Sequence, residues 1–193
     1  MATSKKSSKD KRKLTGAAAD MYEWLEAVAF ALAIVVVLFT FVFRVIRIEG
    51  DSMLDTLHEE DRLIVQNLFY EPENNDIVVV VQDNSHTTEP IIKRVIAIAG
   101  QTVELDPTTG AVTVDGIKID EPYISPDKIM TNAGDSFTYP VKVPEGKIFV
   151  LGDNRPVSFD SRDARLGFVD LDNVLGKALL RIYPVADFGG IYE

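Results

Sequence analysis

Apolar residues form one long continuous run near the N-terminus and many short runs after it. The long run, residues 27–43, has 17 residues without charge or proline. As a helix it measures about 25 Å, near the lower limit for crossing a membrane's hydrocarbon core. Beyond residue 44, short β-branched or alternating stretches predict strands at 76–81, 91–98, 102–105, 112–114, 147–151 and 179–183. We therefore predict a mostly β protein: one N-terminal helix followed by an antiparallel β domain with a coiled or barrel-like sheet.

Three interpretations of the long apolar run compete: a cleaved signal peptide, a buried core helix and a retained transmembrane helix. A signal peptide has a shorter apolar region that ends in small residues, whereas this run ends in bulky Phe43. A core helix would show a polar face, and residues 35–39 show none. Tyr22 and Trp24 precede the run, where interfacial aromatic anchors belong. We expect a transmembrane helix over residues 21–44.

Basic residues are distributed unevenly around this segment. Residues 1–13 carry six basic side chains and one acid, although the whole chain has a net charge of −10. Only Arg44 and Arg47 follow the segment closely. The positive-inside rule therefore predicts a basic cytoplasmic tail over residues 1–20 and an extracytoplasmic domain over residues 45–193. Such a tail could bind nucleic acid, but its place beside the span favours contact with anionic lipid, and the acidic body argues against a general nucleic-acid binder.

Composition and proline content narrow the picture further. Cysteine is absent, which excludes disulfides, zinc–thiolate sites and thiol nucleophiles, and the two histidines argue against a multi-histidine metal site. We expect neither a metal nor a cofactor. Residues 116–146 contain four prolines and weak periodicity, and they follow a predicted hairpin. Residues 101–146 or so are therefore expected to form a hairpin- and loop-rich insertion in the outer domain.

Two segments carry candidate chemistry that can be judged from the residues alone. Ser52 follows the predicted span closely, and its hydroxyl needs a base to become a useful nucleophile. His58 and His86 are isolated in polar surroundings, which is typical of surface residues. Lys93 and Arg94 lie within an apolar strand; charges can protect a strand edge, but apolar neighbours on both faces should draw at least one inward. Burial lowers a lysine pKa while arginine stays protonated, so Lys93 is the candidate base of the two.

A third segment, residues 152–162, reads Gly-Asp-Asn-Arg-Pro-Val-Ser-Phe-Asp-Ser-Arg and follows a predicted strand. Its composition alone is typical of a surface loop. Together with residues 52–57 (Ser-Met-Leu-Asp-Thr-Leu) and 93–95 (Lys-Arg-Val), it resembles the boxes of the type I signal peptidases, which are membrane-anchored serine–lysine proteases. The order and spacing of the boxes agree, and the resemblance covers roughly residues 21–183.

The resemblance implies a single-span serine endopeptidase that removes signal peptides from exported preproteins after small residues. It implies that Ser52 is the nucleophile and that neutral Lys93 is the general base. The supporting residues that it implies are Ser158, which would hydrogen-bond the lysine, the ion pair of Asp160 with Arg162, and Asp153 and Asn154, which would shape the loop. The implied partners are signal peptides and membrane lipid rather than nucleic acid, and we expect a monomer.

Three positions depart from the family's pattern. Asp55 stands where proline is usual, so we expect a looser or differently capped turn that keeps its reactivity. Gly50 stands where some members have a serine that helps to hold the oxyanion, which leaves this work to backbone N–H groups, chiefly that of Ser52. Residues 97–101 replace the usual Gly-Leu-Pro-Gly-Asp and weaken the lysine-box match.

Other function classes stay open on the sequence alone. Esterases that begin with Gly-Asp-Ser use an Asp-x-x-His motif near the C-terminus, whereas Asp55 to His58 has that spacing directly after the serine. Self-cleaving repressor-type proteases share the serine–lysine pair but lack a span. An anchored binding module on the same fold would have an ordinary surface lysine at position 93 and an unreactive Ser52.

Overall fold

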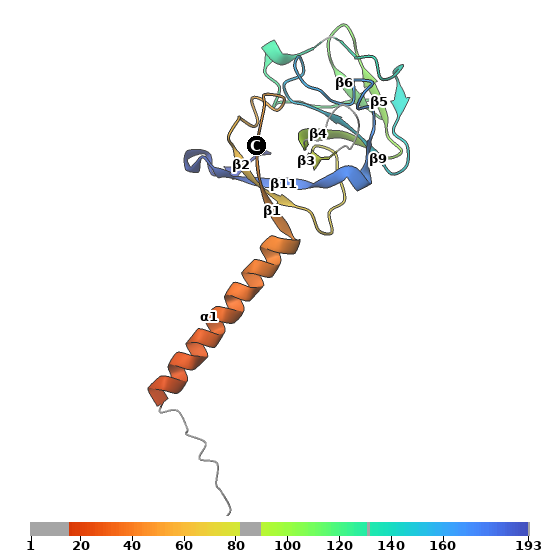
Figure 1. Ribbon diagram of the computed structural model, residues 1–193. Helices are drawn as coiled ribbons and strands as arrows, with labels where there is room; N and C mark the ends of the chain where they lie inside the picture. The colour runs from red at the N-terminus through yellow and green to blue at the C-terminus, as the bar shows by residue number, and fades with distance from the viewer. Residues whose placement is uncertain (1–15, 82–89, 131, 193) are drawn as a thin grey trace, which may run out of the picture. The chain divides into compact units, whose positions relative to one another are not determined.

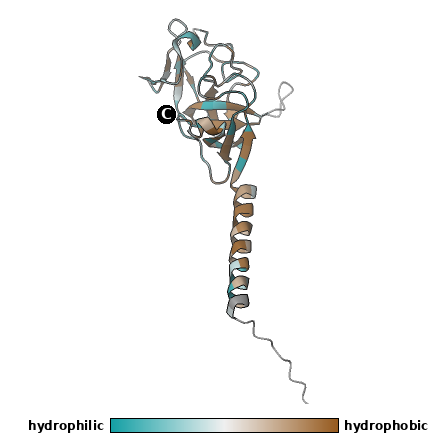
Figure 2. Ribbon diagram, turned by 90° about the vertical axis from the view of Figure 1, so that its left-hand side faces the viewer, coloured by the Kyte–Doolittle hydropathy of each residue, from teal (hydrophilic) through white to brown (hydrophobic). Residues whose placement is uncertain are grey.

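The computed structural model describes residues 16–81, 90–130 and 132–192, in two compact units that divide between Thr40 and Phe41. The six basic residues of the predicted tail and His86 lie outside the described residues. Within the first unit, helix α1 (Gly16–Phe41) is hydrophobic over most of its length (Figure 2). Its segment Ala19–Phe41 is long and apolar enough to cross a membrane, at about 34 Å for 23 residues. The helix begins before the apolar run because alanine, methionine and glutamate, all good helix formers, precede that run.

The second unit is built on an eight-stranded antiparallel sheet (Figure 1). Its strands are β1 (Phe43–Arg47), β2 (Arg62–Gln66), β3 (Ile77–Val80), β4 (Ile91–Ile98), β9 (Lys147–Leu151), β10 (Val169–Asp170), β11 (Val174–Tyr183) and β12 (Gly189–Gly190). The strand order is β1-β2-β11-β3-β4-β9-β10, with β12 paired to β11. Strands β1 and β10 stand at opposite ends of this order, so the sheet curls into a half-barrel without closing. The predicted fold class, mostly β with one N-terminal helix, is confirmed.

Strand β3 shows why the central strands read as continuous apolar runs. Ile77 and Val79 belong to one buried cluster, whereas Val78 and Val80 belong to another. Because successive side chains of a strand point to opposite faces, both faces of the sheet are covered here. All the strands predicted from the sequence are present, but β1, β2, the first half of β11 and the two-residue strands β7, β8, β10 and β12 were not predicted. The apolar run extends past the end of α1 at Phe41 to Phe43, the first residue of β1, so it does not reveal where the helix ends.

A smaller sheet accounts for much of the region between β4 and β9. It has the order β7-β6-β5-β8, and its strands are β5 (Thr102–Leu105), β6 (Val112–Val114), β7 (Ile117–Lys118) and β8 (Val141–Lys142). Short 3-10 helices complete the described chain: η1 (Pro126–Lys128), η2 (Leu171–Asn173) and η3 (Val185–Asp187). Valines of β5 and β6 share a buried cluster with Phe149 of β9, which attaches the small sheet to the large one.

The segment around Ser52 packs against the buried cluster that also contains Ile77 and Val79 of β3. Met53 and Leu57 are 1% and 0% exposed and belong to the same buried cluster as Leu63 of β2 and Ile77 of β3. Ile191, beyond β12, belongs to this cluster too and is 4% exposed. Ile48 before Ser52, and Met53 and Leu57 after it, thus fix the serine's segment to the large sheet.

Candidate active site

The Ser52 segment is a compact turn between β1 and β2. The Leu57 N–H donates to the Met53 carbonyl at 2.9 Å, and the Leu54 N–H donates to the Asp51 carbonyl at 3.3 Å. Gly50 has a φ of +80°, a left-handed conformation that glycine adopts without strain. The backbone conformation at position 50 therefore favours glycine, because a serine with this φ would be strained.

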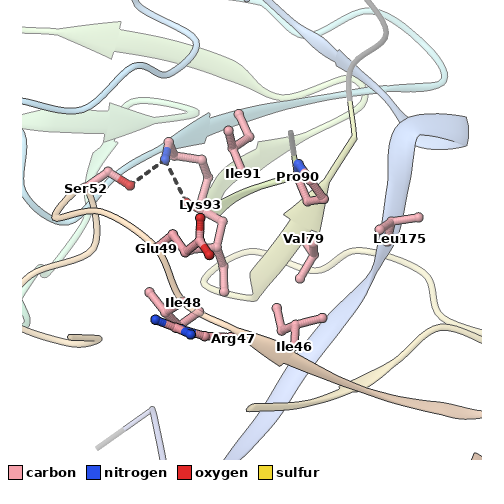
Figure 3. A pocket seen from close by; sticks show the side chains of 11 residues that line it. Ile46, Arg47, Ile48, Glu49, Ser52, Val79, Pro90, Ile91, Lys93 and Leu175 are labelled. Carbon is pink, nitrogen blue, oxygen red and sulfur yellow. Dashed lines mark hydrogen bonds between the residues drawn. The ribbon is translucent and has the colours of Figure 1, made fainter. Parts of the chain in front are cut away.

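Lys93 reaches this turn from strand β4. The residue is 2% exposed, and β4 lies between β3 and β9. Its Nζ donates hydrogen bonds to Ser52 Oγ and to the Ile92 carbonyl oxygen, each at 2.7 Å (Figure 3). The structure thus brings together the two residues that the sequence proposed as nucleophile and base. His58 has no hydrogen bond to Ser52 within the described residues; its backbone N–H donates to Asp61 instead.

The surroundings of Lys93 favour the neutral amine. Burial lowers the Lys93 pKa from 10.5 to about 8, although the nearby carboxylates of Asp160 and Asp153 oppose part of this shift. Neither bond that its Nζ donates goes to a carboxylate; the acceptors are a hydroxyl and a carbonyl. With a pKa of about 8, roughly one lysine in ten is neutral at pH 7, and most are neutral at pH 9.

The loop after β9 grips the Ser52 turn through its backbone. The Asn154 N–H donates to the Ser52 carbonyl at 3.0 Å, and the Asn154 Nδ2 donates to the Asp51 carbonyl at 2.9 Å. Asp153 accepts a hydrogen bond from Thr56 Oγ1 at 2.5 Å. Asp153 and Asn154 therefore tie the loop after β9 to the Ser52 turn, Asn154 at residues 51 and 52 and Asp153 at Thr56.

Arg94 of β4 also binds the loop after β9, through Asp153. The sequence analysis did not predict this role for Arg94. Its Nε and Nη2 donate to the two carboxylate oxygens of Asp153 at 2.9 and 2.6 Å, and both residues are at most 2% exposed. The ring of Tyr123 covers the guanidinium at 3.7 Å. The available signal was a second cation in an apolar strand, but its partner, 59 positions away, could not be identified from the sequence.

Asp160 and Arg162 form the ion pair that the resemblance implies. Arg162 Nε and Nη2 each donate to the carboxylate at 2.8 Å, and Asp160 is fully buried. Asp160 also accepts the Gly152 N–H at 3.0 Å, so the pair holds the start of the loop.

Ser158 is close to the turn but does not bond the lysine. Its hydroxyl is buried and has no hydrogen-bond partner within the described residues. It packs across Gly152, where an added Cβ would lie 2.2 Å from Ser158 Oγ and 2.5 Å from the Ser52 carbonyl oxygen. The Ser158–Lys93 hydrogen bond that the resemblance implies is therefore not formed in this structure, and any larger residue at position 152 would clash.

Two cavities open beside Ser52 and Lys93. The first, of about 470 Å³, lies between the end of β1 and the start of β4 (Figure 3). Its apolar lining consists of Ile46, Ile48, Val79, Pro90, Ile91, Ile92 and Leu175. The second, of about 460 Å³, also has Ser52 and Lys93 in its wall. No cluster of His, Asp and Glu able to hold a metal ion occurs in the described part of the chain.

Comparison with known proteins supplies the family. A family model described as "Signal peptidase, peptidase S26" matches residues 21–183. Signal peptidase I of Bacillus licheniformis is 36% identical over 171 residues, covering 85% of this chain and 89% of the relative. The Bacillus amyloliquefaciens enzyme is 37% identical over 174 residues, covering 86% and 87%. A crystal structure of signal peptidase I from Enterococcus faecalis is 30% identical with a TM-score of 0.42, covering 56% of this chain and 97% of that one. This chain belongs to the signal peptidase family, peptidase S26.

Proposed function

We propose that this protein is a membrane-anchored serine endopeptidase that removes N-terminal signal peptides from exported preproteins, with Ser52 as nucleophile and Lys93 as general base. The observation that carries the proposal is the 2.7 Å hydrogen bond between the buried Lys93 amine and the Ser52 hydroxyl. Membership of the signal peptidase family supports the reaction and the kind of substrate.

The chemistry follows from these two groups. Neutral Lys93 accepts the Ser52 hydroxyl proton as Oγ attacks the carbonyl carbon of the scissile peptide bond. The tetrahedral intermediate collapses to an acyl-enzyme, and the ammonium of Lys93 returns the proton to the departing amine. A water molecule, deprotonated by the same lysine, then releases the signal peptide with a free carboxylate.

Backbone and neighbouring groups support this reaction. The Ser52 N–H makes no hydrogen bond within the described residues, so it is free to bind the oxyanion. The hydrogen bond from Lys93 Nζ to the Ile92 carbonyl oxygen restrains the amine, which helps to keep it oriented toward Ser52. Asp153 and Asn154 hold the turn in place, and the Asp160–Arg162 pair holds their loop. The buried Ser158 hydroxyl packs across Gly152, at the start of the same loop.

The first cavity suits the proposed substrate. Its apolar wall has room for small side chains of an extended segment at the first and third positions before the cut. Strand β1 stands at the edge of the sheet, so an extended peptide could add to it as a further strand.

Cleavage of a preprotein tests the proposal directly. Detergent-solubilised full-length protein, incubated with a purified preprotein, should release a mature protein whose new N-terminus follows a small residue. Ser52→Ala and Lys93→Ala should abolish this cleavage. Lys142→Ala, an exposed lysine of β8, is the matched control and should cleave normally. Cleavage by Ser52→Ala at the parental rate would disprove the nucleophile assignment.

We also propose that α1 anchors the enzyme with its N-terminus in the cytoplasm and residues 45–193 outside. The support is the apolar length of α1 together with the six-to-two ratio of flanking basic residues. Protease added to intact spheroplasts should digest the catalytic domain and leave a membrane-bound fragment. A fully protected domain would contradict this orientation.

A further inference from the structure

Asp55, the residue that stands where the family has proline, makes two side-chain contacts with a distant segment. Its carboxylate accepts hydrogen bonds from the Ser125 hydroxyl and from the Lys128 amine, the latter at 2.5 Å. Ser125 and Lys128 lie 70 and 73 positions along the chain. These two contacts hold the Asp55 pKa below its usual value, Lys128 contributing most.

Residues 121–128, here called the strap, contain both partners of Asp55 and two further contacts with the site. Near its start, Glu121 pairs with the buried guanidinium of Arg155. In its middle, Tyr123 covers the guanidinium of Arg94, which itself binds Asp153. The strap therefore passes over the charged groups that hold the Ser52 turn, and Asp55 joins that turn to the strap's far end.

We propose that Asp55 is a positioning residue: by binding Lys128 and Ser125 it clasps the Ser52 turn to the strap, doing through a tertiary contact what proline does locally in relatives. The inference rests on the proposed function, because its readout is cleavage through Ser52. Proline would restrict the backbone three residues after the serine, whereas Asp55 leaves that backbone freer and restrains it through its side chain.

The clasp should act on the rate and very little on stability. The Asp55 side chain is 53% exposed and that of Lys128 is 16% exposed. Exposed ion pairs contribute little to the free energy of unfolding because water and salt screen them. Small displacements of a nucleophile, by contrast, have large effects on rate, because reacting atoms must be held close to their attack geometry.

The experiment measures kcat and KM for preprotein cleavage in full-length variants. We expect Asp55→Asn and Lys128→Ala each to lower kcat by roughly three- to tenfold, with KM and the melting temperature unchanged. The exchanged pair, Asp55→Lys with Lys128→Asp, should recover at least half of the lost rate. At about 1 M NaCl the parent should approach the single variants, because salt screens the ion pair.

Lys147→Ala provides the matched control. The Lys147–Asp170 pair joins β9 to β10 at 2.8 Å; its carboxylate is as exposed as that of Asp55, at 52%, and its lysine is more exposed than Lys128, at 35%. The pair makes no described contact with the Ser52 turn. Its loss should leave kcat unchanged. Parental kcat in Asp55→Asn and Lys128→Ala, failure of the exchanged pair to recover, or a fall in kcat matched by a fall in folded fraction would each overturn the clasp. Loss of the proposed function looks different: the parent itself would fail to cleave, or Ser52→Ala would cleave as well as the parent.

Discussion

Lys93 and Arg94 are neighbours on one strand, equally buried, yet their surroundings differ in one decisive respect. Both are 2% exposed. Lys93 donates to a hydroxyl and a carbonyl, whereas Arg94 is bound through two nitrogens to the carboxylate of Asp153. Burial without a directly bound counter-ion lowers the Lys93 pKa to about 8, while Arg94 remains a permanent cation.

The comparison teaches how one strand can supply both reactivity and structure. A buried amine without a bonded carboxylate can give up its proton and act as a base. A buried guanidinium with a bidentate partner holds two segments together and cannot titrate. Each of the following predictions changes one side of this contrast, in order of decreasing expected effect.

Placing a permanent charge at position 93 should have the largest effect. Lys93→Arg puts a guanidinium where no carboxylate is bonded, and it cannot accept the Ser52 proton. We expect cleavage to fall by about 10³-fold or more, measured in single turnover with saturating enzyme. Circular dichroism checks that the variant is folded. Retention of most of the activity would show that Lys93 is not the base.

Removing the cation at position 94 should destabilise the fold. Arg94→Met leaves the Asp153 carboxylate buried and unpaired, which should lower the free energy of unfolding by about 3–5 kcal/mol. Urea unfolding in detergent measures this. The double variant Arg94→Met with Asp153→Leu removes both charges and should be less destabilised than Arg94→Met alone. Additive losses in the double variant would argue against the pairing.

Removing the amine at position 93 should raise the free energy of unfolding at neutral pH or leave it unchanged, in contrast to the loss expected for Arg94→Met. Between pH 8 and 10.5 the unfolded chain binds more protons than the folded chain, so stability of the parent rises with pH across this window. Below it, burial of the ammonium opposes folding by up to about 3 kcal/mol. Lys93→Met should therefore be inactive but at least as stable as the parent at pH 7, and the difference should shrink by pH 10. A marked loss of stability at pH 7 would indicate a structural lysine.

The smallest predicted effect is on the pH profile of the parent enzyme. In the proposed mechanism the active form has neutral Lys93, so kcat/KM, which reports the free enzyme, should rise about tenfold between pH 7 and pH 9 and level off above. The midpoint should lie near the Lys93 pKa of about 8. Initial rates in buffers of constant ionic strength give this profile. A rate that falls steadily over this range would conflict with a neutral amine as base.

Local sequence was sufficient to predict the strands whose side chains are buried on both faces of the sheet. Residues 77–80 and 91–98 could be predicted because continuous β-branched runs need no knowledge of their partners. Strand β1 was missed because its local sequence does not separate it from the end of the apolar run. It is a strand because it pairs with β2, whose residues lie about twenty positions later. Likewise the resemblance implied a hydrogen bond from Ser158 to Lys93, but the structure leaves the Ser158 hydroxyl without a partner among the described residues.

The amino-acid sequence by itself determined the apolar helix, the mostly β class, and the residue types at Ser52, Lys93 and the loop of residues 152–162, because these depend on side-chain chemistry and short-range pattern. Only the tertiary structure decided which buried cation is paired, which residues the Asp55 carboxylate binds, and that Ser52 Oγ lies 2.7 Å from the lysine amine. These contacts join residues 41 to 73 positions apart. Burial and hydrogen bonding at such separations depend on how the whole sheet packs, and a pKa depends on both.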